Sequence, residues 1–252
     1  MIITLCGKGG CGKSTTATLL AKEFARKGKS VLVIDTDESN FGLYRQLGME
    51  LPKDFTDYFG GRQDILKNVM GKPKFQYNFF DHKWAISDIP SQFLSEKDGI
   101  KLLAIGKIHE TGEGCACPMG IIARQFISNL KLDENDVVIT DTEAGIEHFG
   151  RGVETDVDVI LMVVDPSYES LKLSAKIAEL SESIHKPLYY VLNKVDASNE
   201  AIMKDAVNDP NKIIAVIPNS NSIAMSGLKG KELEKEWDGV TEMTDFLSEN
   251  VL

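Results

Sequence analysis

The amino-acid sequence predicts an α/β fold in which a doubly wound, mostly parallel β-sheet carries helices on both faces. Short apolar runs alternate with helix-patterned segments along most of the chain, as expected for successive β-α-β units. The runs are continuously apolar, a pattern that is typical of strands buried on both faces of a parallel sheet. A glycine-rich turn, "GKGGCGK", joins the first apolar run to the first helical segment. These three observations define the expected fold class.

The strands of this sheet are expected in short apolar runs at residues 2–6, 31–35, 101–105, 137–141, 159–164, 188–193 and 213–217. Helices are expected between them, at residues 13–27, 119–130, 167–184 and 198–207. The first helix should close near Gly28 and the third should end before Pro187, because glycine and proline mark helix ends.

Residues 50–95 follow this alternation less clearly and are rich in aromatic side chains, namely Phe75, Tyr77, Phe79, Phe80 and Trp84. A surface for stacking bases is one interpretation. The segment has little basic charge, so packing in a core or between subunits is favoured. No repeat or low-complexity linker divides the chain, and residues 1–252 are therefore expected to form a single domain.

The composition limits the classes of partner. The 252 residues carry a formal net charge of −10, which disfavours nucleic acid and anionic lipid as partners. No apolar run approaches the ~20 residues of a membrane span. The tail, residues 236–252, has five acidic residues and no Lys or Arg, so membrane docking through it is not expected. The N-terminus lacks a signal pattern. We expect a cytoplasmic protein whose four cysteines form no disulfide framework.

The glycine-rich turn fits the phosphate-loop pattern G-x-x-x-x-G-K-[ST]. Its backbone amides should surround the phosphates of a nucleotide, and the following helix N-terminus adds positive potential. Lys13 would neutralise the β- and γ-phosphates, and the Ser14 hydroxyl would hold Mg²⁺. The expected nucleotide contacts are Gly7, Gly9, Gly10, Cys11, Gly12, Lys13, Ser14 and Thr15.

A second lysine, Lys8, extends this motif to G-K-G-G-x-G-K-[ST]. The extended motif resembles the deviant phosphate loop of the nitrogenase iron protein and of MinD- and ParA-like ATPases. The resemblance implies a P-loop ATPase fold, ATP and ADP as ligands, and a homodimer. It also implies that Lys8 reaches across the dimer interface to the partner subunit's nucleotide, where its charge would stabilise phosphoryl transfer as an arginine finger does.

Two further segments match the switches of this family. "VIDTDESN" follows the second strand, and its carboxylates, Asp35 and Asp37, are expected to hold the attacking water and the Mg²⁺ shell. Asp37 is favoured as the residue that positions the water. "VVITDTEAGIEH" resembles a Walker-B strand that ends in Asp141, followed by the second switch around Gly145. The position of Asp141 at the carboxyl end of a strand is where α/β folds place ligand groups.

The resemblance also implies a site for the adenine base. "VLNKVD", with Asn193 and Lys194, is similar to the adenine-binding segment of the family, in which Asn193 would read the adenine edge. Pro218 in "IPNS" would flank the base.

The run "GEGCACPMG" contains the pair Cys115 and Cys117. Residues i and i+2 of an extended segment project to the same side, so both thiolates can reach one ion. Two thiolates make half a site, which a two-fold dimer would complete. Cys6 and Cys11 are expected to pack in the core. His109 and His148 are left out of the metal set.

This layout, together with "DTEAGIEHFGRG", resembles the CooC-type ATPases that assist nickel insertion into carbon monoxide dehydrogenase. The resemblance implies a metallochaperone that binds Ni or Zn at the cysteine pair, with carbon monoxide dehydrogenase or acetyl-CoA synthase as the client. Two alternatives stay open. Four interface thiolates would also hold an iron–sulfur cluster, as in a carrier or electron-transfer ATPase. A MinD- or ParA-like regulatory switch would leave the cysteines incidental.

Overall fold

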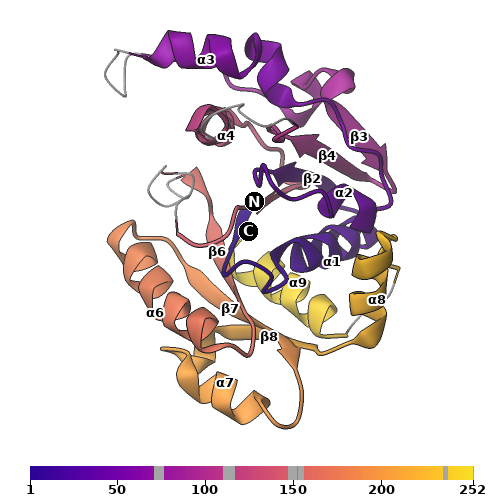
Figure 1. The fold of residues 1–252 in the computed structure, drawn as a ribbon, viewed down its shortest axis with the longest axis vertical. Helices are drawn as coiled ribbons and strands as arrows, with labels where there is room; N and C mark the ends of the chain where they lie inside the picture. Colours follow the sequence, from indigo (N-terminus) through magenta and orange to yellow (C-terminus); the bar gives the residue numbers. More distant parts are fainter. Residues whose placement is uncertain (71–76, 110–116, 147–151, 153–155, 235–237, 252) are drawn as a thin grey trace.

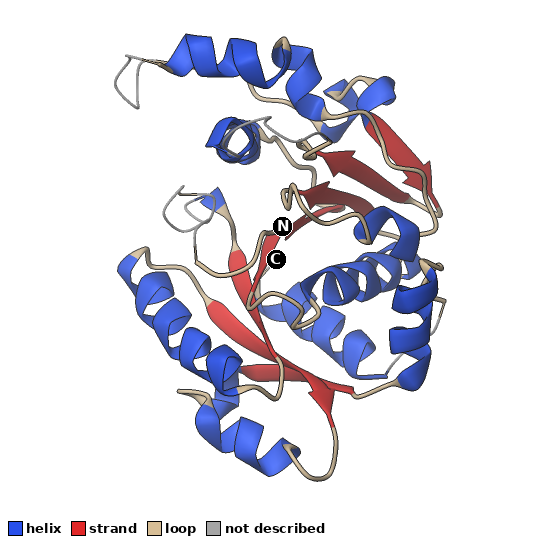
Figure 2. Cartoon of the chain, viewed as in Figure 1, coloured by secondary structure: helices blue, strands red, loops and turns tan. Residues whose placement is uncertain are grey.

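A single eight-stranded sheet forms the centre of the molecule (Figures 1 and 2). The computed structural model describes residues 1–70, 77–109, 117–146, 152, 156–234 and 238–251. Every pair of neighbouring strands is parallel except β3 with β4, which confirms the predicted fold class. The spatial order is β3 (Leu94–Lys97), β4 (Ile100–Ala104), β2 (Ser30–Asp35), β5 (Asp136–Asp141), β1 (Ile2–Cys6), β6 (Val159–Val164), β7 (Leu188–Val195) and β8 (Ile213–Pro218).

The register of the central strands brings several chain segments together at one edge of the sheet. Asp35, the last residue of β2, lies directly opposite Asp141, the last residue of β5. Leu5 of β1 lies opposite Asp141 from the other side. Because parallel strands end at the same edge, the turn after β1 and the segments after β2 and β5 meet there.

Helices cover both faces of this sheet (Figure 1). One face carries α1 (Lys13–Arg26) and α9 (Asp238–Asn250), and the other carries α4 (Cys117–Asn129), α6 (Tyr168–Ser183) and α7 (Glu200–Ala206). Side chains along β1 alternate between the two cores. Ile3 and Leu5 pack with α1, whereas Ile2 and Cys6 belong to the core on the opposite face. This double burial explains why the strands are apolar without alternation.

The expected strands and helices are all present, with each end within two residues of the predicted one. Sequence patterns missed several elements, most of which are short or weakly patterned. They are β3, α2 (Leu43–Gln46), α3 (Gly61–Val69), α8 (Asn221–Lys229), α9, and the 3₁₀ turns Phe55–Phe59, Ile86–Asp88, Ser91–Phe93 and Pro210–Lys212. Only Ile65 is buried in α3, and no residue of α8 is buried, so these helices carry no continuous apolar stripe.

The aromatic residues of the irregular segment form a core cluster around Phe55. Its ring centroid lies 5.1 Å from that of Phe126 in α4 and 6.1 Å from that of Trp84. Phe80 and Trp84 are buried, and Phe79 packs against the same core. The prediction of core packing is confirmed for these residues, whereas Phe75 lies outside the described residues. The cluster fixes the segment onto α4.

The acidic tail of the chain forms α9. Val240, Met243 and Leu247 are buried in the core that α9 shares with α1 and β8. The apolar side of this helix is therefore occupied within the chain. Across the described residues, no helix combines the length and the apolar character that a bilayer crossing requires.

Candidate nucleotide-binding site

The loop between β1 and α1 requires glycine at two positions of close approach. Gly7 has a φ of 146° and Gly12 a φ of 107°, in the region that favours glycine. A Cβ atom at Gly7 would lie 2.6 Å from the Val163 carbonyl oxygen, and one at Gly12 would lie 2.0 Å from Asn193 Nδ2. These glycines let the loop lie against β6 and β7, and α1 begins directly after it.

A cavity of about 660 Å³ opens in front of this loop. Its volume is within the range of small-molecule sites. Three segments line it: the phosphate loop with the start of α1, the segment after β2, and the segment after β5. The lining residues are Gly9, Gly10, Gly12, Lys13, Ser14, Thr15, Asp37, Glu38, Ser39, Asn40, Gln46, Glu143 and Ala144. Most of the predicted phosphate contacts, and Asp37, therefore share one cavity.

Lys13 is bent back over the phosphate loop. Its ammonium donates to the carbonyl oxygens of Gly7, at 3.2 Å, and Lys8, at 3.4 Å. The side chain is 7% exposed, so its charge acts with little screening by water. A phosphate in the cavity would meet this ammonium together with the amides at the start of α1.

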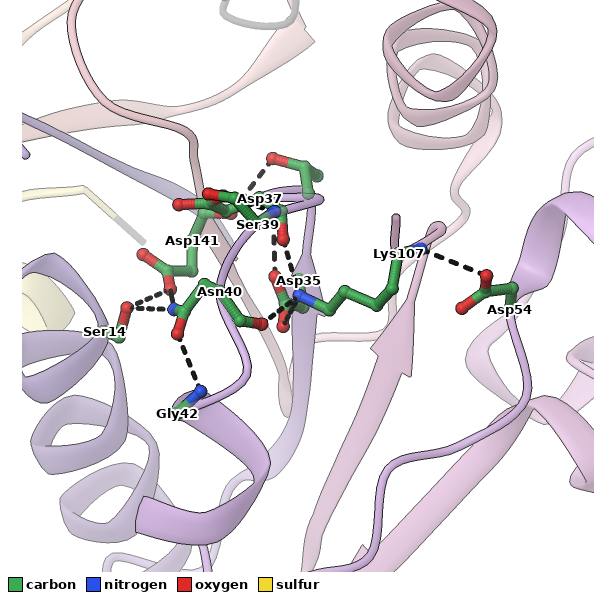
Figure 3. A network of polar contacts seen from close by, with 10 residues as sticks. Ser14, Asp35, Asp37, Ser39, Asn40, Gly42, Asp54, Lys107 and Asp141 are labelled. Carbon is green, nitrogen blue, oxygen red and sulfur yellow. Dashed lines mark hydrogen bonds and ion pairs between the residues drawn. The ribbon is translucent and has the colours of Figure 1, made fainter. Parts of the chain in front are cut away.

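Ser14, Asn40 and Asp141 form the polar centre of the site (Figure 3). The Ser14 hydroxyl donates to Asp141 Oδ2 at 2.6 Å, and Asn40 Nδ2 donates to Ser14 Oγ at 2.6 Å. Asp141 Oδ1 is buried and has no hydrogen-bond partner among the described residues. Burial raises the pKa of Asp141 to about 6, although the hydrogen bond from Ser14 opposes the rise.

This donor set fits a magnesium ion. A hydroxyl and a carboxylate with a free buried oxygen are hard oxygen ligands of the kind that Mg²⁺ takes beside phosphates. The Ser14 hydroxyl lies against the Asp141 carboxylate, and the Mg²⁺-binding role of Ser14 stays a prediction.

The two carboxylates of the first switch have different surroundings. Asp37 lines the cavity and accepts bonds from the backbone amide and the hydroxyl of Ser39. Asp35 is 1% exposed, accepts from the Asp37 amide at 3.1 Å, and pairs with the Lys107 ammonium at 2.6 Å. Burial raises the pKa of Asp35 to about 7, against the effect of Lys107. Asp35 therefore supports the switch from behind the cavity.

Besides Asn40, sequence reasoning missed Lys107. It follows β4 in "AIGKIH" and is completely buried. The available signal was its place after a strand, since residues at the carboxyl ends of parallel strands gather at one edge. A single lysine in a loop has no motif that would distinguish it from a solvated one.

The second switch contacts the phosphate loop through its backbone. Gly145 has a φ of 89°, and its amide donates to the Gly7 carbonyl at 3.1 Å. The Thr142 hydroxyl donates to the Leu5 carbonyl at 2.7 Å. The segment after β5 is thereby tied to the chain on either side of Cys6.

Lys8 lies on the surface of its own chain. Its ammonium is 3.3 Å from Glu169 Oε2 and 3.3 Å from the Ser167 hydroxyl, at the start of α6. The Lys8 side chain is 32% exposed and that of Glu169 is 76% exposed. Such exposed pairs contribute about 0–1 kcal/mol, so this contact does not fix the lysine firmly.

Two of the three residues predicted for the adenine base contact the phosphate loop. Asn193 is 5% exposed, and its amide donates to the Cys11 carbonyl at 2.7 Å. The Lys194 ammonium donates to the Gly10 carbonyl at 2.6 Å. Pro218 ends β8 and is exposed. These three residues lie outside the described lining of the cavity, and the base-reading role of Asn193 stays a prediction.

Comparison with known proteins agrees with this geometry. Residues 2–233 match the family model described as the CobQ/CobB/MinD/ParA nucleotide binding domain. The chain belongs to this family. The predicted membership in the MinD- and ParA-like group of nucleotide-binding proteins is therefore confirmed.

Individual members of the family show how far the likeness extends. The chain is 52% identical over 249 residues to an uncharacterized ATP-binding protein of Methanocaldococcus jannaschii, covering 98% of this chain and 100% of that protein. It is 32% identical over 202 residues to the carbon monoxide dehydrogenase accessory protein CooC of Rhodospirillum rubrum, covering 77% of this chain and 74% of that protein. The narrower CooC-type assignment stays a proposal.

Among solved structures, the septum site-determining protein MinD from Pyrococcus horikoshii, complexed with Mg-ADP, has a TM-score of 0.71 and 16% identity. The match covers 98% of this chain and 95% of that one. This likeness shows that the chain has a MinD-like α/β fold.

The chain has two pairs of cysteines, Cys6 with Cys11 and Cys115 with Cys117. Cys6 and Cys11 are buried, and burial raises the pKa of the Cys11 thiol to about 11, which makes it a poor thiolate ligand. Cys115 lies outside the described residues, and Cys117 is the first residue of α4. The described residues contain no group of three or more potential metal ligands. His109 pairs with Asp54 at 3.0 Å, and His148 lies outside the described residues.

Proposed function

We propose that this protein is a Mg²⁺-dependent ATPase that acts as a homodimer and assists metal insertion into a client enzyme. The leading assignment is nickel delivery to carbon monoxide dehydrogenase or acetyl-CoA synthase. The observation that carries the ATPase activity is the Ser14, Asn40 and Asp141 centre beside the phosphate loop. The match to CooC supports the choice of client.

Different residues would bind the phosphates, hold Mg²⁺ and orient the attacking water. Amides of the phosphate loop and the Lys13 ammonium bind the phosphates of ATP and hold them against the start of α1. Ser14, with Asp141 behind it, would hold Mg²⁺, which neutralises phosphate charge when bound. Asp37 lines the same cavity and would orient the attacking water. The products are ADP and inorganic phosphate.

Lys8 would act in the partner subunit. When two copies close around ATP, the ammonium would leave Glu169 and approach the phosphates bound by the other copy. The exposed Lys8–Glu169 contact is weak enough to be exchanged for a phosphate. The added charge would stabilise the transferring phosphoryl group.

The cysteine pair would carry the metal cargo. Each chain supplies two thiolates, Cys115 and Cys117, and a dimer would supply four. Four thiolates suit tetrahedral Zn²⁺ or square-planar Ni²⁺. ATP binding would close the dimer around the metal, and hydrolysis would reopen it for release to the client.

The decisive experiment titrates Ni²⁺ and Zn²⁺ separately into reduced, metal-free protein while the mass in solution is measured. We expect one metal per dimer and a shift from monomer to dimer without ATP. The Cys115→Ser, Cys117→Ser double variant should lose tight binding, whereas Cys6→Ala, a buried thiol, should retain it.

Three results would change the assignment. One metal per monomer without a change in mass would refute a bridged site. Tight binding in the double variant would move the metal site elsewhere. A brown protein with iron and sulfide after anaerobic purification would favour an iron–sulfur carrier.

A further inference from the structure

The ammonium of Lys107 sits at the back of the first switch, and its hydrogen-bonding capacity is fully used. It donates to Asp35 Oδ2 at 2.6 Å, to the Asp37 carbonyl at 2.5 Å and to the Asn40 carbonyl at 2.6 Å (Figure 3). An ammonium has three donors, and each one has an acceptor here. The side chain is 0% exposed. Lysine is rarely buried to this extent, because removing its charge from water is costly.

The backbone around Lys107 is fixed from both sides. Its amide donates to Asp54 Oδ2 at 3.1 Å, and its carbonyl accepts from Arg62. The neighbouring amides of Ile105 and Ile108 donate to the carbonyls of Asp35 and Glu38, each at 3.0 Å. Several bonds therefore determine where the ammonium lies.

Lys107 holds two residues of the first switch, Asp37 and Asn40, whose side chains line the cavity. The backbone carbonyls of Asp37 and Asn40 precede and follow the two residues Glu38 and Ser39, and both accept a hydrogen bond from the Lys107 ammonium (Figure 3). The side chains of the same residues line the cavity, where Asn40 binds Ser14 and contacts Asp141. One buried cation thus fixes a group beside the magnesium position and the carboxylate expected to orient water.

We propose that Lys107 is a positioning residue for ATP hydrolysis, acting through Asp37 and Asn40. This inference rests on the proposed ATPase function and adds a residue that contacts neither the phosphates nor the metal. The three hydrogen bonds of the Lys107 ammonium go to the first switch, so ATP should still bind to the phosphate loop when Lys107 is replaced. Hydrolysis should suffer, because a displacement of about 1 Å in a positioning group costs about 100-fold in rate.

The test compares Lys107→Met with the double variant Lys107→Met, Asp35→Asn. The single variant leaves Asp35 buried without its cation, so stability should fall. The double variant removes both charges and should recover part of that stability. The methionine side chain that replaces Lys107 in both variants has no donor for the Asp37 and Asn40 carbonyls. We expect kcat to fall about 10- to 100-fold in both, while the Kd for ATP changes by less than about 3-fold.

Hydrogen exchange supplies a readout that does not need hydrolysis. Amides in residues 37–42 should exchange faster in both variants, whereas those in β6 should not. The matched control is Lys27→Met, because the Lys27 ammonium also donates three hydrogen bonds, to Thr241, Thr244 and Asp245. These contacts lie at the far end of α1 from the cavity, so this variant should keep kcat and the exchange of residues 37–42 unchanged.

The outcomes separate this inference from the proposed function. Recovery of kcat together with stability in the double variant would show a purely structural ion pair and overturn the inference. Wild-type kcat in Lys107→Met would do the same. If wild-type protein binds ATP but does not hydrolyse it, the proposed function fails. Unchanged exchange in residues 37–42 would overturn the claim that Lys107 positions Asp37 and Asn40, and faster exchange would support that positioning independently of hydrolysis.

Discussion

The phosphate end and the base end of the candidate site are built in different ways. At the phosphate end, Ser14, Asn40 and Asp141 converge within hydrogen-bonding distance, and one Asp141 oxygen is buried without a hydrogen-bond partner among the described residues. At the base end, Asn193 and Lys194 direct their polar groups to carbonyls of the phosphate loop. The phosphate end therefore keeps a buried carboxylate oxygen for a ligand, whereas the side chains predicted to contact the base are hydrogen-bonded to the phosphate loop.

The two ends also differ in how far the sequence alone reveals their contacts. The phosphate loop is one contiguous motif, and its partners follow strands that the apolar pattern identifies. The bracing contacts join residues far apart in the sequence. Asn193 and Cys11 are separated by 182 positions, and Gly12 leaves room for the Asn193 amide. A motif can therefore suggest that Asn193 belongs to the site without revealing which atoms it contacts.

The largest expected effect comes from Lys8→Ala. If Lys8 completes the phosphate end of the partner subunit, its loss should slow hydrolysis in the ATP-bound dimer by about 10³-fold, the lower end for an arginine finger. ATP binding by the monomer should change little, because the contacts of Lys8 are exposed. Single-turnover hydrolysis and sedimentation with ATP would measure both effects.

The control for this variant is Glu169→Gln, which removes the charge that pairs with Lys8 within the chain and leaves the contact with the Ser167 hydroxyl in place. Hydrolysis in this control should stay at the wild-type rate or rise. Normal closure and hydrolysis in Lys8→Ala would rule out the trans-acting lysine and leave the phosphate end complete within one chain.

The second prediction concerns Lys13→Ala. Lys13 is nearly buried beside the phosphate loop, so its removal leaves the phosphates of ATP without their main cation. Charged hydrogen bonds contribute about 1.5–3 kcal/mol each, and we expect affinity for ATP to fall about 100-fold. Calorimetry would measure the change, with Lys67→Ala in α3, an exposed lysine, as the control. Wild-type affinity would remove the basis for a nucleotide site here.

The sequence was most informative for residues that belong to a contiguous motif or directly follow a strand. The strand pattern, the phosphate loop and the ends of β2 and β5 were all predictable, because parallel strands gather their following segments at one edge. Asp35 was expected among the ligands of the site, yet it lies behind the cavity. Its partner, Lys107, follows β4, and the strand order β4-β2-β5 makes the two neighbours.

Two of the missed elements lack the pattern by which a sequence reveals an element. β3 is a short edge strand, and α8 buries none of its residues, so neither carries the periodic apolar pattern that reveals an element. The sequence showed that residues 50–95 are rich in aromatic side chains, but not that they cluster around Phe55. Its packing onto Phe126 of α4 joins distant segments of the chain, which local patterns do not report.

The smallest expected effect tests the base end. In Asn193→Ala, the Cys11 carbonyl loses its buried hydrogen bond, which contributes about 1 kcal/mol net. Affinity for ATP should therefore fall about 5-fold. Because the lost bond braces the phosphate loop and does not involve the base, affinity for GTP should fall by the same factor. Competition binding with ATP and GTP would give the ratio.

The matched control is Lys194→Ala, which removes the neighbouring brace to the Gly10 carbonyl. The Lys194 side chain is 45% exposed, so water replaces part of the lost bond and the fall in affinity should be about 2-fold for both nucleotides. A selective loss of ATP in Asn193→Ala, with GTP unchanged, would mean that Asn193 turns to the adenine edge when nucleotide binds. The base end would then be assembled by the ligand, whereas the phosphate end is already formed before ATP arrives.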